Sequence, residues 1–226
     1  MAKEKILIIA AHPDDEALGC GGYIAKKAEE GAEIKAVFLT NGVSARDEIG
    51  DDEIKARNIA LTKSSEILGI HEFYSFDFPD NRLDTVPLIE VIKEVERVIA
   101  EFLPNVIITH HLGDLNIDHQ IAHKVALTAC RPIVGRSVTQ IIAFEVLSST
   151  EWTSSSAANQ FVPNLFVNIT DFMEKKLASL NAYKDEMRES PHSRSLRAVE
   201  ALATLRGECS GYKYAEGFMI IRQLNN

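Results

Sequence analysis

Two short polar segments of this 226-residue sequence gather side chains that can bind a metal ion. The first is Ala-Ala-His-Pro-Asp-Asp-Glu at residues 10–16, and the second is the His-rich stretch at residues 110–119. Imidazole and carboxylate groups bind catalytic zinc, which takes three protein ligands and keeps a fourth position for water. We therefore expect His12, Asp15 and His119 to form a three-ligand metal site.

The chemistry expected of such a site is metal-assisted hydrolysis. Two neutral imidazoles and one carboxylate leave a bound Zn²⁺ with about one unit of positive charge, which lowers the pKa of a bound water toward ~7. Asp14, beside the ligand Asp15, is placed to take a proton from that water. The same ligand types also suit Fe²⁺, Co²⁺ or Mn²⁺, so they favour zinc without excluding these ions.

Alternating strand and helix patterns are expected to position the two segments. Apolar and β-branched runs predict strands at residues 6–9, 34–39, 73–78, 106–109, 141–147, 165–169 and 218–221. Segments of helical period predict helices at residues 16–30, 53–68, 86–102, 118–129, 171–187 and 195–205. This alternation predicts an α/β fold with three layers around a mainly parallel sheet.

Both polar segments follow predicted strands, and parallel α/β sheets bind ligands at the carboxyl ends of their strands. A simpler interpretation is that Asp14 and Asp118 only cap helices, since a carboxylate accepts hydrogen bonds from a helix N-terminus. The coincidence of ligand types at two strand ends favours a site. Of the remaining loops, residues 44–52 are predicted to be mobile, and residues 148–164 to hold Trp152 either anchored or facing a substrate.

Composition excludes several other classes of protein. The 24 basic and 33 acidic residues give a formal net charge of −9, which argues against nucleic-acid and anionic-membrane partners. Three widely spaced cysteines exclude a disulfide framework and fit a reducing compartment. No apolar run approaches the roughly 20 residues of a membrane span, and the run at residues 6–11 is shorter than the core of a signal peptide. We expect one cytoplasmic enzyme domain over residues 1–226.

The segment IAAHPDDEALGCGG at residues 9–22 closely resembles the N-terminal signature of the PIG-L/LmbE family of metal-dependent N-deacetylases. These enzymes hydrolyse acetamido groups on N-acetylglucosamine-type sugars and sugar conjugates. Further similarities fall at Leu39–Gly42, Arg57, Pro79–Asp80, Asp118–His119, Arg206–Gly207 and Tyr214–Glu216. The resemblance implies a Rossmann-like domain and an acetylated amino sugar as the substrate. Relatives often form homo-oligomers, so the resemblance leaves a homo-oligomer open.

Carried over by position, the resemblance gives roles to named residues. It implies that His12, Asp15 and His119 bind zinc, that Asp14 is the general base, and that Arg57 and Asp80 contact the sugar. Asp118, beside a ligand, is a further candidate catalytic residue. Two of these residues also have ordinary structural interpretations, because Arg57 could pair along its helix and Asp80 lies in a turn sequence.

One departure from the family pattern concerns the second segment. Better-known relatives carry His-Pro-Asp-His, whose first His stabilises the oxyanion, whereas this chain has Asn116-Ile117-Asp118-His119. Asn116 can donate a neutral hydrogen bond but cannot supply a proton. We expect His192, in Ser-Pro-His-Ser-Arg-Ser, to protonate the leaving amine from another loop, although it could equally be a solvated loop histidine. Further candidates are His110, His111 and His123.

Three rival functions stay open at this point. A non-catalytic module that binds a metal or a sugar is supported only by Asn116, and a deacylase for another small amide would use the same chemistry. A dinucleotide-dependent enzyme would need a G-x-G-x-x-G motif, which is absent. The glycines at residues 19, 21 and 22 fit close packing of the first helix on the sheet.

Overall fold

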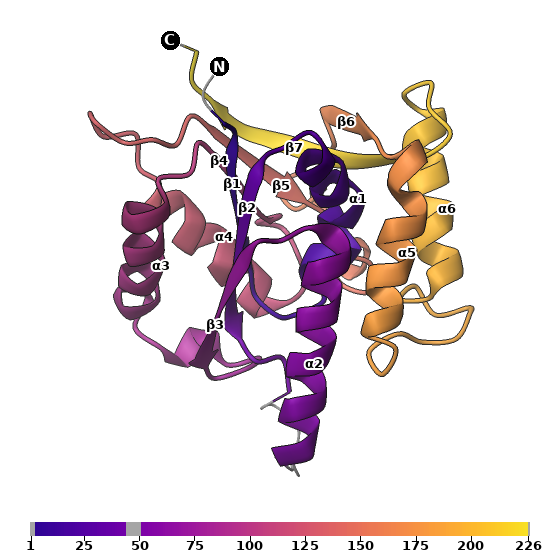
Figure 1. Cartoon of the computed structure of the whole chain (residues 1–226), viewed down its shortest axis with the longest axis horizontal. Helices are drawn as coiled ribbons and strands as arrows, with labels where there is room; N and C mark the ends of the chain where they lie inside the picture. Colours follow the sequence, from indigo (N-terminus) through magenta and orange to yellow (C-terminus); the bar gives the residue numbers. More distant parts are fainter. Residues whose placement is uncertain (1–2, 44–50, 226) are drawn as a thin grey trace.

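The computed structural model describes residues 3–43 and 51–225, and their strands form one seven-stranded sheet in the order β3-β2-β1-β4-β5-β7-β6 (Figure 1). The strands are β1 Lys5–Ala10, β2 Glu33–Thr40, β3 Glu72–Phe78, β4 Val106–His110, β5 Gln140–Phe144, β6 Leu165–Asn168 and β7 Ala215–Gln223. Strands β1 to β5 pair in parallel, and β7 runs antiparallel to both β5 and β6. The prediction of a mainly parallel sheet is confirmed.

Helices cover both faces of this sheet. They are α1 Asp15–Glu29, α2 Asp51–Leu68, α3 Leu88–Phe102, α4 Ile117–Ala129, α5 Met173–Ala182 and α6 Leu196–Glu208. Figure 1 shows α3 and α4 on one face and α1, α2, α5 and α6 on the other. The central strand β1 serves both cores, since Ile6 and Ile8 join one apolar cluster while Leu7 and Ile9 join the other. Burial on both faces explains why its sequence is continuously apolar.

Helix α1 lies very close to the sheet because its glycines leave room. A Cβ atom at Gly19 would collide with the ring of Phe144, and one at Gly22 would lie 2.7 Å from Cδ1 of Ile169. The predicted packing role is therefore confirmed for Gly19 and Gly22, whereas a Cβ at Gly21 would lie 3.4 Å from Cγ of Lys176, an ordinary contact. The helix is interrupted at Cys20, whose backbone is non-helical with φ −145°.

Several predicted boundaries differ from the structure. The helix predicted at residues 171–187 is shorter in the structure. The 3₁₀ turn Thr170–Phe172 precedes it, and α5 ends at Ala182. The next residue is Tyr183, whose hydroxyl donates to Glu16 at 2.8 Å. The strand predicted at residues 218–221 is longer because pairing with β5 and β6 extends it to nine residues. Of the stretch predicted to be mobile, residues 44–50 lie outside the described residues, and residues 51 and 52 begin α2.

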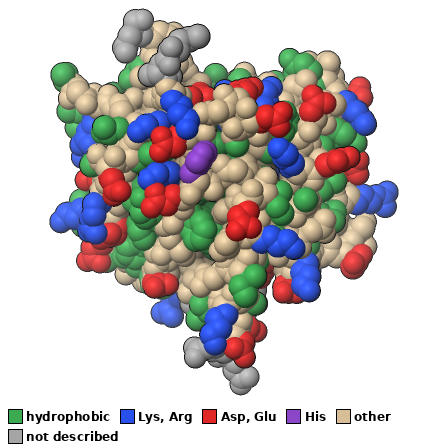
Figure 2. Space-filling model, in the orientation of Figure 1, with side chains coloured by type: hydrophobic (Ala, Val, Ile, Leu, Met, Phe, Trp, Pro, Cys, Tyr) green, Lys and Arg blue, Asp and Glu red, His purple; other side chains and the backbone are tan. Residues whose placement is uncertain are grey.

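The molecular surface carries mixed charge. On the face drawn in Figure 2, acidic and basic side chains are interspersed rather than gathered into one patch of either sign. Within the described part of the chain, no helix combines the length and apolar character needed to cross a membrane.

Candidate metal centre

The loops after β1 and β4 meet at one edge of the sheet. These strands pair in parallel with Ile9 opposite Thr109, so both chains leave the sheet at its carboxyl edge. The strand order also reverses between β1 and β4, since β2 and β3 lie on one side and β5 on the other. Open α/β sheets bind ligands at such a switch point. The structure therefore brings the two polar segments together, as the sequence predicts.

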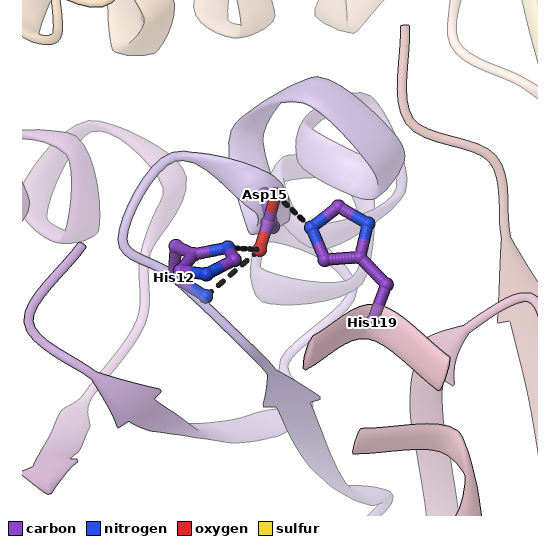
Figure 3. Close-up of side chains that lie close together, drawn as sticks. All are labelled: His12, Asp15 and His119. Atoms are coloured by element: carbon purple, nitrogen blue, oxygen red, sulfur yellow. Dashed lines mark hydrogen bonds and ion pairs between the residues drawn. The ribbon is translucent and has the colours of Figure 1, made fainter. Parts of the chain in front are cut away.

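The three predicted metal ligands converge at this point (Figure 3). Ligand atoms of His12, Asp15 and His119 all lie within 4.8 Å of one another, and all three residues are buried. Nδ1 of His12 is 3.3 Å from Oδ2 of Asp15, and Nε2 of His119 is 3.4 Å from Oδ1 of Asp15. Among the described residues, Asp15 Oδ1 has no hydrogen-bond partner. A buried carboxylate oxygen without a partner is costly, so this donor set fits a divalent cation.

A carboxylate lies behind each of the two imidazoles. Nδ1 of His119 is 3.2 Å from Oδ1 of Asp114. Nε2 of His12 is 3.2 Å from Oδ2 of Asp118 and 3.1 Å from Oδ1 of Asp80. Such a carboxylate orients a ligating imidazole, selects its tautomer and raises its basicity. The structure thus places Asp118 beside His12, a predicted ligand, and the catalytic role suggested for Asp118 by the sequence stays a prediction.

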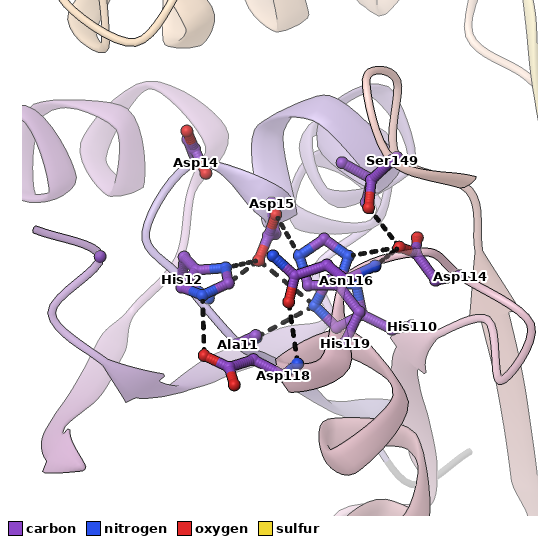
Figure 4. A network of polar contacts seen from close by, with 12 residues as sticks. Ala11, His12, Asp14, Asp15, His110, Asp114, Asn116, Asp118, His119 and Ser149 are labelled. Carbon is purple, nitrogen blue, oxygen red and sulfur yellow. Dashed lines mark hydrogen bonds and ion pairs between the residues drawn. The ribbon is translucent and has the colours of Figure 1, made fainter. Parts of the chain in front are cut away.

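Asp114, one of these supporting carboxylates, is itself held by hydrogen bonds (Figure 4). Asp114 accepts hydrogen bonds from Ser149 Oγ, from Thr150 Oγ1 at 2.7 Å and from the Asn116 amide at 2.9 Å. Burial would raise the pKa of Asp114, but the His119 ring and the two hydroxyls lower it to about 2.

Asp118 accepts hydrogen bonds from two backbone amides in the loop after β3. These donors are Asn81, at 2.6 Å, and Leu83, at 3.1 Å. Three separate loops therefore fix the imidazoles around the centre.

Asp14, the predicted base, is buried in a backbone conformation that few residues adopt. Its φ of 110° is unusual for a residue other than glycine and costs about 1–3 kcal/mol. Its amide donates to Oε2 of Glu16 at 2.9 Å, which helps to hold this conformation. Its Oδ2 lies 3.3 Å from Nη2 of Arg57 and 3.3 Å from Nη1 of Arg194. Burial raises the pKa of Asp14, although both guanidinium groups oppose this shift.

A cavity of about 250 Å³ opens beside the cluster. Six residues predicted to belong to the site line it, namely His12, Asp14, Arg57, Asp80, Asn116 and His119. Gly42, Asn81, Ser148, Ser149, Glu186 and Arg194 complete the lining. Arg57 reaches the cavity from α2 and pairs with Glu186 at 3.1 Å. The cavity wall is therefore rich in groups that can donate or accept hydrogen bonds.

Asn116 is the N-cap of helix α4 and lines the cavity. Its Oδ1 accepts the Asp118 amide at 2.8 Å, which caps the helix, and its Nδ2 donates to Oδ1 of Asn81 at 3.1 Å. The Asn116 side chain is thus held in place from both ends.

His192 is exposed and does not belong to the cavity lining. Its ring meets Trp152 edge to face, with centroids 5.6 Å apart, and its Nδ1 accepts the Arg194 amide at 3.0 Å. Arg194, two residues further along this loop, is the residue that reaches Asp14. The sequence indicated the loop but not this arginine, because the contact joins residues 180 positions apart.

The three further histidine candidates are held inside the fold. His110 stacks on His119 at 3.9 Å, and its Nε2 accepts the Ala11 amide at 3.0 Å. Burial, together with the neighbouring His119, lowers the pKa of His110 to about 4. Nδ1 of His123 is 2.8 Å from the carbonyl oxygen of His110, and Nε2 of His111 is 2.9 Å from that of Asn159.

Fold and site together define an α/β protein with a cluster of His and Asp side chains suited to a metal ion at the switch point of its sheet. The family model of PIG-L, described as GlcNAc-PI de-N-acetylase, matches residues 7–130. The chain belongs to the PIG-L family.

Similar proteins include two deacetylases by name. "Uncharacterized deacetylase YaiS" of Escherichia coli is 32% identical, over 80% of this chain and 91% of that protein. Diacetylchitobiose deacetylase of Thermococcus kodakarensis is 28% identical, over 96% of this chain and 83% of that protein. The solved structure of N,N'-diacetylchitobiose deacetylase from Pyrococcus horikoshii superposes with a TM-score of 0.77 at 23% identity, covering 98% of this chain and 85% of that one. At that identity the structural likeness shows a shared fold.

Proposed function

We propose that this protein is a zinc-dependent N-deacetylase that removes the acetyl group from an N-acetylated amino sugar or sugar conjugate. The observation that carries the proposal is the convergence of His12, Asp15 and His119 beside a cavity whose wall includes Asp14. Membership of the PIG-L family and the deacetylase names of its relatives support the reaction class. Zinc is our choice of metal because of the ligand types, and Fe²⁺ is the alternative.

Different side chains of the site have separate roles in amide hydrolysis. When bound by His12, Asp15 and His119, zinc supplies polarisation of the acetamide carbonyl and a water of lowered pKa. Asp14 takes a proton from the attacking water, and its position on the cavity wall supports this role. Arg194 and Asn116 line the same cavity and can donate hydrogen bonds to the oxygen that becomes negative.

The leaving amine also needs a proton. Asp14, once protonated by the attacking water, can return that proton to the amine. His192 is the second candidate, because its loop also carries Arg194. We assign Arg57 and Asp80 to the sugar hydroxyls, since both line the cavity.

Metal removal and reloading test the proposal. The chelated protein is reloaded with Zn²⁺ or Fe²⁺, and acetate release is measured from N-acetylglucosamine and N,N'-diacetylchitobiose. We expect release with metal and none after chelation. A protein that binds metal but releases no acetate would instead be a binding module. Release of acyl groups from other small amides alone would favour a different deacylase.

We also infer that residues 1–226 form one deacetylase domain of the cytoplasm with a small-molecule partner. All described strands join one sheet, which supports a single domain. Cys20, Cys130 and Cys209 form no disulfide, as is typical of a reducing compartment.

A further inference from the structure

An exposed aromatic side chain lies next to the segment that lines the cavity. Trp152 is the one tryptophan of the sequence, and 51% of it is exposed. It ends the 3₁₀ turn Thr150–Trp152, which directly follows the cavity residues Ser148 and Ser149. Its amide donates to the Ser149 carbonyl oxygen at 3.2 Å, so the ring is carried by the same loop that forms part of the wall.

Hydrogen bonds couple this loop firmly to the metal centre. Thr150 Oγ1 donates at 2.7 Å to Asp114, the carboxylate behind His119, and Ser149 Oγ donates to the same group. The amides of Ser148 and Ser149 donate to Glu151 at 2.7 and 3.2 Å. Trp152 is therefore presented from a rigid support.

A second loop braces the indole. The His192 ring packs edge to face on it at an interplanar angle of 76°. His192 is tied to Arg194, whose Nε donates to Ser148 Oγ at 2.8 Å. Where the two loops meet, Arg194 lines the cavity, whereas Trp152 and His192 lie outside its lining. We call Trp152 and His192 the aromatic shelf.

The size of the cavity indicates which part of a substrate could contact the aromatic shelf. Its volume of about 250 Å³ is below the roughly 300–1,000 Å³ of pockets that enclose drug-sized ligands. One acetamido sugar ring fits this space, and a second ring linked to it would extend outside. The C–H face of a pyranose is apolar and packs well on an exposed indole, which removes apolar area of both from water.

We propose that the aromatic shelf is a subsite for a second sugar ring, so that the enzyme favours a disaccharide or a longer sugar conjugate over a single acetamido sugar. This inference rests on the proposed deacetylase function and adds the substrate class. Trp152 is then a specificity residue and takes no part in the chemical step.

Kinetics with two substrates test the subsite. We expect Trp152→Ala to raise KM for N,N'-diacetylchitobiose about tenfold while KM for N-acetylglucosamine stays unchanged. Trp152→Phe keeps a flat ring and restores most of the affinity. Val134→Ala is the matched control, because Val134 is fully exposed in the loop before β5, at the opposite edge of the sheet. An equal effect of Trp152→Ala on both substrates, or none on either, would overturn the subsite.

Fluorescence gives a readout that needs no turnover. Because Trp152 is the single indole, its emission reports on the shelf alone, and Trp152→Phe gives the baseline. We expect chitobiose, the fully deacetylated disaccharide, to shift the emission to shorter wavelength, and glucosamine to leave it unchanged. A shift with glucosamine as well, or none with chitobiose, contradicts the subsite.

The two measurements separate the subsite from the reaction. If no acetylated sugar releases acetate, the deacetylase proposal fails, while a chitobiose-specific shift still supports the subsite. If acetate is released equally well from both sugars and the emission stays constant, the deacetylase proposal stands and the subsite is wrong.

Discussion

Nε2 of His12 lies 3.2 Å from Oδ2 of Asp118, while Nδ1 of the same ring faces Asp15 at 3.3 Å. We therefore expect Asp118 to act on the candidate metal centre through His12, as a positioning residue. An imidazole that donates to a carboxylate on one side presents its free lone pair on the other. The sequence suggested a catalytic role for Asp118, and substitution of this residue distinguishes the two roles.

Asp118→Asn is expected to weaken zinc binding about tenfold, because an amide raises the basicity of His12 less than a carboxylate does, while Asp80, 3.1 Å from the same Nε2, still faces the ring. Competition with a chelating dye measures the affinity. If the role is positioning, excess zinc restores most of kcat. Loss of kcat that excess zinc does not restore would indicate a direct catalytic role. Asp77→Asn, an exposed aspartate on β3, is the matched control.

Asp14→Asn is expected to lower kcat by roughly a hundredfold to ten-thousandfold, which is the usual contribution of a general base. Asparagine tolerates positive φ better than most residues, so the unusual backbone at φ 110° is retained. Zinc content and thermal stability should stay close to those of the wild type. Full activity of this variant would show that Asp14 is not the base.

The sequence predicted the parts of the site that depend on local spacing and on strand ends. His12, Asp14 and Asp15 lie within four residues, and the parallel pairing of β1 with β4 delivers His119 to the same edge. The antiparallel direction of β7 was not predictable, because an apolar run carries no information on direction.

Long-range side-chain contacts were also beyond the sequence. Asp14 and Arg194 meet across 180 residues, and Ser149 meets Asp114 across 35. Both contacts come from loops without periodic pattern, where only the folded arrangement determines which side chain turns inward. This explains why the sequence indicated the loop of His192 but singled out the exposed residue in it.

Arg194→Gln is expected to lower kcat/KM by about tenfold to a hundredfold, the size of a hydrogen bond to a charged group. The substitution removes a guanidinium that lies 3.3 Å from Asp14 and lines the cavity. Arg197→Gln is a suitable control, since Arg197 is exposed on α6. Steady-state kinetics at full zinc content measure the difference. Equal values for the two variants would remove Arg194 from the site.

His192→Ala distinguishes two roles for this exposed histidine. A large fall in kcat at full zinc content would identify His192 as the acid that the sequence predicted. A rise in KM for the disaccharide identifies it as a support for Trp152, 5.6 Å away. We expect the second pattern, because His192 does not line the cavity. Kinetics with both sugars, together with zinc analysis, provide the measurement.

The buried ion pair between Lys176 and Glu216 bridges the interruption of helix α1 at Cys20. Lys176 donates to the Leu18 carbonyl oxygen at 2.8 Å, and Glu216 accepts the amides of Gly22 and Tyr23 at 2.9 and 2.7 Å. The pair thus satisfies backbone groups that the break leaves without helical partners.

Removing one member of this pair leaves a buried charge and two buried amides without partners. We expect Glu216→Ala to lower the free energy of unfolding by about 3–5 kcal/mol, measured by urea denaturation. Lys175→Ala is the matched control, because Lys175 pairs with Glu29 at the surface, where such a pair contributes about 0–1 kcal/mol. A similar small effect of both substitutions would show that the break in α1 does not depend on the buried pair.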